Sequence, residues 1–258
     1  MKPSLRKALV AGGAVLAIVV LVPVVTLLWT FRGLEPVVNG AELPGGARLL
    51  RAGVSNVYLL PTGSGVALVD CGNERDAATI RAELSRRGLT DDAVEAIFLT
   101  HGHLDHLTGC GAFPKAKVLA LSDEAPIVEG DAVSRGIMPR LRGSAKPLAV
   151  RVTDRLRDGE TVTVGTLSLR VFQVRGHTDG SAIFLANGVL YAGDSAFVEE
   201  GGSVRGAAYI FSDDPDESWR EVRALADKLA AEGTEVRAVV TGHSGPLVGE
   251  GALAKLRE

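Results

Sequence analysis

The chain has 258 residues, of which 46% are hydrophobic and 23% are charged, a size and composition that suit one α/β domain. After residue 32 it carries 24 basic and 31 acidic residues, and this net charge of −7 argues against a nucleic-acid surface. Two cysteines are too few for a disulfide framework or a four-cysteine zinc site.

The N-terminus combines a short basic segment, residues 1–7, with an apolar run over residues 8–30 that contains no charged side chain. As a helix, the run from Ala8 to Trp29 would be about 33 Å long, enough to cross a bilayer. A cleaved signal peptide is the rival interpretation, but its apolar core is usually only about 7–15 residues long. Because the positive charges precede the run, we expect a single-pass anchor in the cell membrane, with the remainder on the periplasmic or extracellular side.

Residues 31–46 are rich in Gly and Pro and are expected to form a linker to a domain over residues 47–258. Short apolar runs within that domain alternate with turn residues and predict many strands. The expected strands are Asn56–Leu60, Val66–Asp70, Val94–Leu99, Lys117–Leu121, Thr161–Val164, Leu167–Val174, Ala182–Leu185, Gly188–Tyr191 and Val236–Thr241. Helical spacing predicts helices over Asp76–Arg87 and Asp216–Ala231, so a layered α/β sandwich is expected.

A cluster of potential metal ligands follows the predicted strand Val94–Leu99, in the sequence His-Gly-His-Leu-Asp-His. Alternate side chains of an extended segment share a face, so His101 and His103 can converge on one metal while Asp105 and His106 point elsewhere. Imidazole suits zinc, iron, copper or nickel, and a carboxylate can complete such a site. Three histidines and one aspartate within six residues predict a metal centre.

This motif resembles the signature of the metallo-β-lactamase-fold superfamily, and the resemblance covers roughly Ala47 to Gly249. The later motifs of that family have counterparts at Gly176-His177-Thr178, Gly193-Asp194-Ser195 and Gly242-His243-Ser244. Arg175 stands where the family often has Pro. The resemblance implies a four-layer αββα sandwich, here preceded by one N-terminal transmembrane helix.

The same resemblance implies two sets of metal ligands and a bridging carboxylate. The first set is His101, His103 and His177; the second is Asp105, His106 and His243. Asp194 would bridge the two ions. Asp70, at the end of a predicted strand, is similar to an aspartate that orients one of the family's histidines, although it could equally cap the strand.

The implied activity is that of a metal-dependent hydrolase with two Zn²⁺ ions per chain, with iron or manganese as alternatives. A hydroxide bridging the two metals would attack a small ester-like substrate such as a thioester, lactone or amide. Asp105 would be both a ligand and the catalytic proton acceptor. Serine catalysis is not expected, because Ser181, Ser195 and Ser244 follow tight turns and lack a free histidine as base.

Other branches of the family remain alternatives. A β-lactamase is disfavoured because those enzymes usually place cysteine or serine near the Asp194 position. Glyoxalase II proper is not expected either, since the 15 residues after His243 leave no room for its C-terminal helical domain. A flavodiiron protein is excluded, because it would normally have Glu at the His103 position. A persulfide dioxygenase would hold one iron with the positions of His101, His177 and Asp194. A binding protein with a vestigial metal site is a third functional class.

Several features stay open from the sequence. Cys71 and Cys110 could be small buried residues, a disulfide, or redox or metal-binding residues. Arg205, Tyr209 and Phe211 are candidates for substrate contacts. The oligomeric state is unknown, and the expected partners are a small-molecule substrate and, through the N-terminal helix, a membrane.

Overall fold

The computed structural model describes residues 21, 22 and 24–258, and the chain divides into two compact units, Met1–Leu34 and Glu35–Glu258. Most of the expected membrane anchor, residues 8–30, lies outside the described residues. Residues 21, 22 and 24–30 are helical. Within the described part of the chain, no helix has the length and hydropathy needed to span a bilayer.

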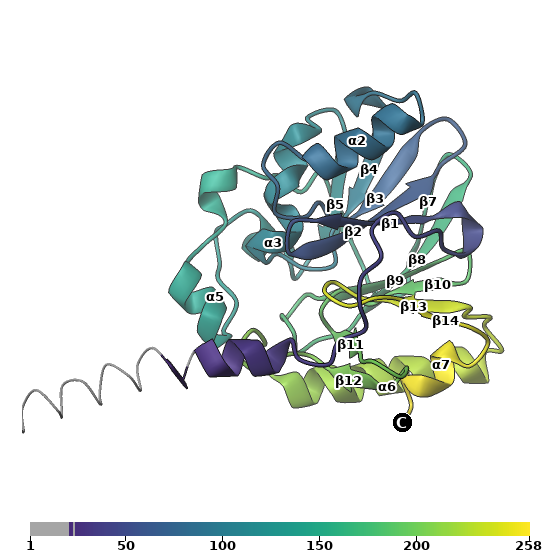
Figure 1. Cartoon of the computed structure of the whole chain (residues 1–258). Helices are drawn as coiled ribbons and strands as arrows, with labels where there is room; N and C mark the ends of the chain where they lie inside the picture. Colours follow the sequence, from purple (N-terminus) through teal and green to yellow (C-terminus); the bar gives the residue numbers. More distant parts are fainter. Residues whose placement is uncertain (1–20, 23) are drawn as a thin grey trace, which may run out of the picture. The chain divides into compact units, whose positions relative to one another are not determined.

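The second unit contains two six-stranded sheets (Figure 1). The first has the order β1-β2-β3-β4-β5-β6, with antiparallel pairing up to β3 and parallel pairing from β3 onward. Its strands are β1 (Arg48–Ala52), β2 (Ser55–Pro61), β3 (Val66–Val69), β4 (Val94–Phe98), β5 (Lys117–Leu121) and β6 (Asp154–Leu156). The parallel strands end at a common edge, and that edge carries the metal-ligand motif.

The second sheet has the order β14-β13-β10-β9-β8-β7, in which only β10 and β13 pair in parallel. Its strands are β7 (Thr161–Val164), β8 (Leu167–Gln173), β9 (Ala182–Ala186), β10 (Val189–Tyr191), β13 (Ala238–Val240) and β14 (Leu247–Val248). A separate two-stranded ribbon pairs β11 (Ala196–Val198) with β12 (Val204–Gly206).

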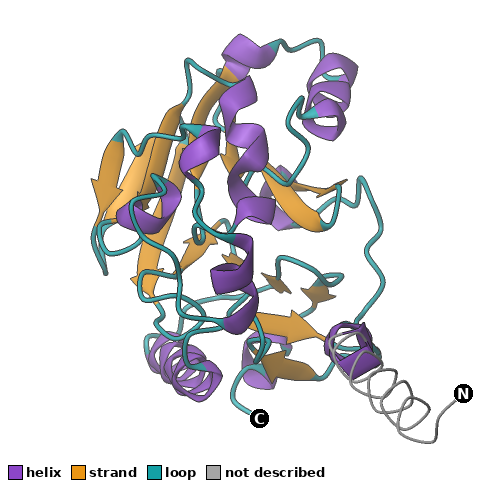
Figure 2. Cartoon of the chain, turned by 90° about the vertical axis from the view of Figure 1, so that its left-hand side faces the viewer, coloured by secondary structure: helices purple, strands orange, loops and turns teal. Residues whose placement is uncertain are grey.

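The longer helices lie on the outer faces of the two sheets (Figure 1). Figure 2 shows the helices and strands in a second orientation. The longest are α2 (Ala78–Arg86), which packs with the first sheet, and α6 (Pro215–Ala231), which packs with the second. The others are α3 (Leu104–Leu107), α4 (Ala125–Val128), α5 (Ile137–Arg142) and α7 (Ala252–Lys255), with 3₁₀ turns at Pro44–Gly46, Asp91–Ala93, Thr108–Ala112 and Lys146–Leu148. Three buried apolar clusters separate these layers, so the expected αββα sandwich is confirmed.

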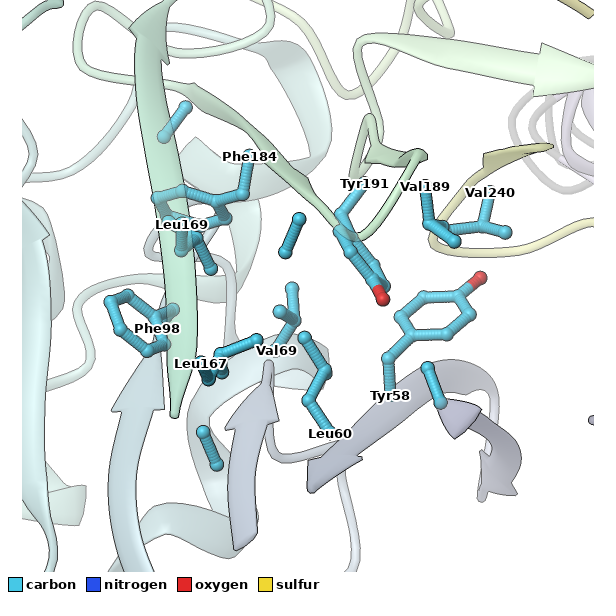
Figure 3. Packing of buried hydrophobic residues seen from close by; sticks show 14 of the residues in the cluster. Tyr58, Leu60, Val69, Phe98, Leu167, Leu169, Phe184, Val189, Tyr191 and Val240 are labelled. Carbon is cyan, nitrogen blue, oxygen red and sulfur yellow. The ribbon is translucent and has the colours of Figure 1, made fainter. Parts of the chain in front are cut away.

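The central cluster joins the two sheets through aromatic pairs (Figure 3). The rings of Tyr58 and Tyr191 meet edge to face at 5.2 Å, and Phe98 packs on Phe184 at 5.7 Å. The hydroxyl of Tyr58 donates to the carbonyl of Thr241 at 2.7 Å. Because Thr241 directly follows β13, this bond fixes the end of the second sheet to the first.

Glu35–Gly46, which the sequence assigned to a linker, belongs to the second unit. Leu43 is buried, and the amide of Gly40 donates to the carbonyl of Leu49 at 2.8 Å. These contacts hold the segment against β1, so the folded unit starts before the expected Ala47.

Candidate metal centre

Each predicted ligand lies in the loop that follows a strand or in the short helix α3. His103 has an extended backbone (φ −70°, ψ 144°), and helix α3 begins one residue later. The chain therefore turns between His103 and Asp105, which separates the first two histidines from Asp105 and His106. His177 follows β8, and Asp194 and His243 follow β10 and β13, whose parallel pairing places both residues at the same edge.

His101, His103 and His177 form one cluster, whose ligand atoms lie within 4.8 Å of one another. The Nδ1 atom of His103 is 3.0 Å from Nε2 of His177. The ring of His101 lies 4.6 Å from that of His103 and 4.4 Å from that of His177. Three imidazoles from two loops thus converge on one point.

Asp105, His106 and His243 form a second cluster, and the ring of His106 lies 4.1 Å from that of His101. A carboxylate oxygen of Asp105 lies 3.3 Å from Nε2 of His243 and 3.9 Å from Nε2 of His106. Asp194 lies between the two clusters. Its oxygens are 3.0 Å from His243, 3.4 Å from His106 and 3.9 Å from His177.

Unpaired polar atoms test whether this site suits a metal. Nε2 of His101, Nε2 of His106 and Oδ1 of Asp194 are buried and make no hydrogen bond in the described part of the chain. Buried polar atoms are almost always paired, so three that converge fit a bound cation. Gly242 lies against them, and a Cβ there would collide with Asp194 and His106. The donor set of imidazoles and carboxylates suits zinc.

Electrostatics divide the histidines into two groups. Burial and neighbouring imidazoles lower the pKa of His103 to about 3, and burial lowers the pKa of His177 to about 4. Burial also opposes charge on His243, but the carboxylates of Asp194 and Asp105 outweigh it and raise its pKa to about 9. Asp194 and Asp70 likewise outweigh burial and raise the pKa of His106 well above its usual value. The first cluster is therefore neutral and ready for a metal, whereas His106 and His243 must each release a proton to bind one.

A sequence profile of the metallo-beta-lactamase superfamily matches residues 50–243, which include every predicted ligand. The chain belongs to this superfamily. Hydroxyacylglutathione hydrolase of Cupriavidus taiwanensis is 31% identical over 182 residues, covering 68% of this chain and 58% of that protein. The enzyme of the same name from Ruegeria pomeroyi is 31% identical over 174 residues, covering 66% of this chain and 57% of that protein. The match thus spans less than two thirds of these relatives.

Solved structures show the same superfamily fold. A metallo-beta-lactamase family protein from Thermus thermophilus superposes with a TM-score of 0.60 at 29% identity, covering 83% of this chain and 79% of that one. The metallo-beta-lactamase MIM-1 from Novosphingobium pentaromativorans gives a TM-score of 0.63 at 23% identity, covering 87% and 88%. The second likeness concerns the fold alone.

Asp70 supports the candidate metal centre through hydrogen bonds to His106 and Thr100. Its carboxylate accepts hydrogen bonds of 2.8 Å from Nδ1 of His106, from the hydroxyl of Thr100 and from the amide of Thr100. Asp70 therefore orients the imidazole of His106 and also caps the end of the strand, so both roles expected from the sequence correspond to contacts in the structure. With Nδ1–H donating to Asp70, the Nε2 lone pair of His106 faces the cluster.

Sequence reasoning missed Glu124, a fully buried carboxylate that links two ligand loops. It accepts from the amide of Gly102 at 2.6 Å, from the hydroxyl of Thr178 at 2.8 Å and from the amide of Gly180 at 3.1 Å. Burial raises its pKa to about 7. The sequence did contain a clue to this position, because Glu124 follows β5 and the parallel neighbour of β5, β4, leads into the His101 loop.

Two buried serines, also missed, hydrogen-bond the outer nitrogens of the first cluster. Oγ of Ser134 lies 2.9 Å from Nε2 of His103, and Oγ of Ser212 lies 3.0 Å from Nδ1 of His177. Both serines come from irregular segments distant in sequence from the histidines, and nothing in the local sequence marks them.

The remaining candidates have structural contacts. Oγ of Ser181 accepts a hydrogen bond from the amide of Thr178 at 2.9 Å, and Oγ of Ser244 accepts one from the amide of Val198 at 2.8 Å. These are the contacts expected of turn residues, not of catalytic nucleophiles. Cys71 and Cys110 form a disulfide with a Cα–Cα distance of 5.4 Å. The amide of Cys71 donates to the carbonyl of His106 at 2.7 Å, so the disulfide lies directly behind the ligand loop.

Of the three candidates for substrate contacts, one lies beside the centre. Phe211 lines a pocket together with His103 and Asp105. Arg205 lies 3.5 Å from Glu199 and covers the ring of Phe197, and Tyr209 is exposed.

Proposed function

We propose that the protein is a dinuclear metal-dependent hydrolase of small ester-like substrates, with thioesters as the first class to test. The observation that carries this proposal is the position of Asp194 between the two ligand clusters, within 3.9 Å of His177 and 3.0 Å of His243. Asp194 would therefore help to hold both ions. The persulfide dioxygenase alternative uses one iron and leaves Asp105, His106 and His243 without a role.

Two bound divalent ions would supply a hydroxide at neutral pH and polarise the substrate carbonyl. The side chains do the rest. Asp105 is ionised at neutral pH, because the imidazoles of His243 and His106 lower its pKa despite its burial. It is therefore available to accept a proton as the carbonyl is attacked. Asp70 and Glu124 hold the ligand loops in place, which lowers the entropy cost of assembling the site.

The relatives named hydroxyacylglutathione hydrolase favour thioesters as the substrate class, since hydroxyacylglutathione is a thioester. The superfamily fold is shared by many activities, so the fold alone selects no substrate.

The test is a hydrolysis panel with thioester, lactone, β-lactam and phosphodiester substrates, using zinc-loaded protein. We expect thioester hydrolysis that a chelator abolishes and added Zn²⁺ restores, and that Asp194→Asn reduces at least 100-fold. Asp227→Asn, a neutralised surface carboxylate that pairs with Arg257, is the matched control. Uptake of oxygen with a persulfide, together with one iron per chain, would instead support the dioxygenase.

We also propose that the catalytic unit lies outside the cytoplasmic membrane, held by the apolar run over residues 8–30. The basic residues before this run support that orientation. The Cys71–Cys110 disulfide is consistent with an oxidising compartment. Fractionation of cells, followed by protease digestion of intact cells or spheroplasts, tests this proposal. Recovery of the full chain in the soluble cytoplasmic fraction would contradict it.

A further inference from the structure

A pocket opens beside the candidate metal centre, between the first ligand loop and the segment around α5. His103 and Asp105 form its inner wall. At least half of the other lining residues are apolar side chains from several segments, among them Leu104, Ile127, Val133, Pro139, Ala145 and Phe211. A substrate held at the metal ligands would therefore extend one of its groups into an apolar space.

The pocket is built from segments that hydrogen bonds hold together. The amide of Met138 in α5 donates to the carbonyl of Ile210 at 2.9 Å, and the amide of Gly136 donates to Asp213 at 2.9 Å. On the inner side, Ile127 packs so closely on Gly102 that a Cβ there would collide with it. The wall formed by α5 is thus fixed to the loop that carries Phe211, and the floor is fixed to the ligand loop.

One cation lines this apolar pocket. The guanidinium of Arg142 lies 5.6 Å from the centre of the Phe211 ring, and both residues belong to the pocket wall. Across the described residues, no carboxylate forms an ion pair with Arg142. A guanidinium over an aromatic face is well placed to bind a carboxylate or another oxyanion. Arg140, in the same helix, does not line the pocket.

We propose that this pocket binds an apolar group of the substrate that ends in an anion, with the chain packed against Ile127 and Phe211 and the anion bound by Arg142. This inference rests on the proposed function, because it deepens the substrate class of the same site. The preferred substrate is then an ester or thioester with a few methylene groups between the reacting carbonyl and a carboxylate or similar group. Arg142 determines specificity and takes no part in the chemistry.

Binding of metal-directed thiols tests this inference without requiring hydrolysis. A thiolate binds zinc, so its tail samples the pocket next to the metals. Calorimetry on zinc-loaded protein would compare mercaptoalkanes of two to six carbons whose tails end in a carboxylate, a sulfonate, a hydroxyl or a methyl group. We expect affinity to rise about threefold to fourfold per added methylene until the anion reaches Arg142. At that length the anionic tails should bind about 5–10-fold more tightly than the hydroxyl tail.

The variants Arg142→Met, Arg142→Lys and Arg140→Met separate a specific contact from general charge. Arg142→Met should remove the preference for anionic tails, Arg142→Lys should retain part of it, and Arg140→Met should leave it unchanged. Equal affinity for anionic and hydroxyl tails at every length, or an equal effect of both methionine variants, overturns the inference. A protein that shows the preference but hydrolyses no thioester would contradict the proposed function alone.

Discussion

Replacing Asp70 by Asn tests how the fold prepares one histidine for a metal. The carboxylate accepts from Nδ1 of His106 and twice from Thr100, each at 2.8 Å, with both side chains buried. If the amide oxygen of Asn keeps the backbone bond to Thr100, its NH₂ group faces the Nδ1–H of His106. Two donors then oppose each other, and His106 must move its proton to Nε2, the atom that faces the ligand cluster.

Loss of such a supporting carboxylate typically lowers metal affinity by about 10–100-fold, or about 1.4–2.7 kcal/mol. Only the ion held by His106 should be affected, since His101, His103 and His177 keep their own contacts. The mispaired buried amide should also lower the free energy of unfolding of the metal-free protein by about 1–3 kcal/mol. At about 2–4 °C per kcal/mol for a domain of this size, Tm should fall by several degrees.

Competition titration with a chromophoric zinc chelator measures the two affinities, and calorimetry of the metal-free protein gives Tm. Asp227→Asn removes the same charge from an exposed ion pair with Arg257 and serves as the control. If the Asp70→Asn variant binds both ions as tightly as the unaltered protein, the Asp70 carboxylate does not prepare His106 for a metal.

Three further predictions concern the surroundings of the centre. Glu124→Gln sets an NH₂ group against an amide or hydroxyl donor. This substitution should destabilise the metal-free protein by about 1–3 kcal/mol and weaken the first zinc site. An unchanged Tm would count against the role of Glu124 in joining the two ligand loops. His243, with a pKa raised to about 9, is protonated at neutral pH and must be neutral to bind a metal. Because the pKa of His106 is raised as well, zinc affinity of the second site should rise with pH through neutrality, by up to about tenfold per pH unit for each proton released. Calorimetry in buffers of different ionisation enthalpy measures that proton release, and a flat pH profile would contradict the prediction. Reduction of the Cys71–Cys110 disulfide, whose sequence separation is 39, should cost about 4 kcal/mol by the loop-closure estimate and lower Tm by roughly 10 °C. A Cys71→Ala/Cys110→Ala variant should not respond to reductant, and an intact protein whose mass does not change on reduction would show that the bond is absent.

The sequence predicts the regular elements well where apolar periodicity is strong. The strand Lys117–Leu121 has the same limits in the structure, and the predicted helix Asp216–Ala231 differs by one residue at its start. Short elements without such a pattern were missed, among them β1 (Arg48–Ala52), β6 (Asp154–Leu156) and α5 (Ile137–Arg142). Two of the five residues of β1 are arginines, so its strand conformation depends on pairing with β2 rather than on its own composition.

The seven candidate ligands could be named from the sequence because their motif is compact and its later parts recur in a fixed order. Their supporting residues could not, apart from Asp70. The contacts of Ser134 and Ser212 with the histidines depend on how loops pack across the sandwich, which no local pattern encodes. Glu124 shows a middle case, in which the parallel pairing of β4 and β5 would have placed it near the ligand loop.

We propose that one chain binds two metal ions and that Asp194 is a ligand of both. Native mass spectrometry of protein purified without chelators, combined with elemental analysis, measures this directly. We expect two zinc ions per chain, and one or fewer after Asp194→Asn. Fewer than one metal per chain in the unaltered protein, or a single iron that does not increase with added zinc, would contradict it.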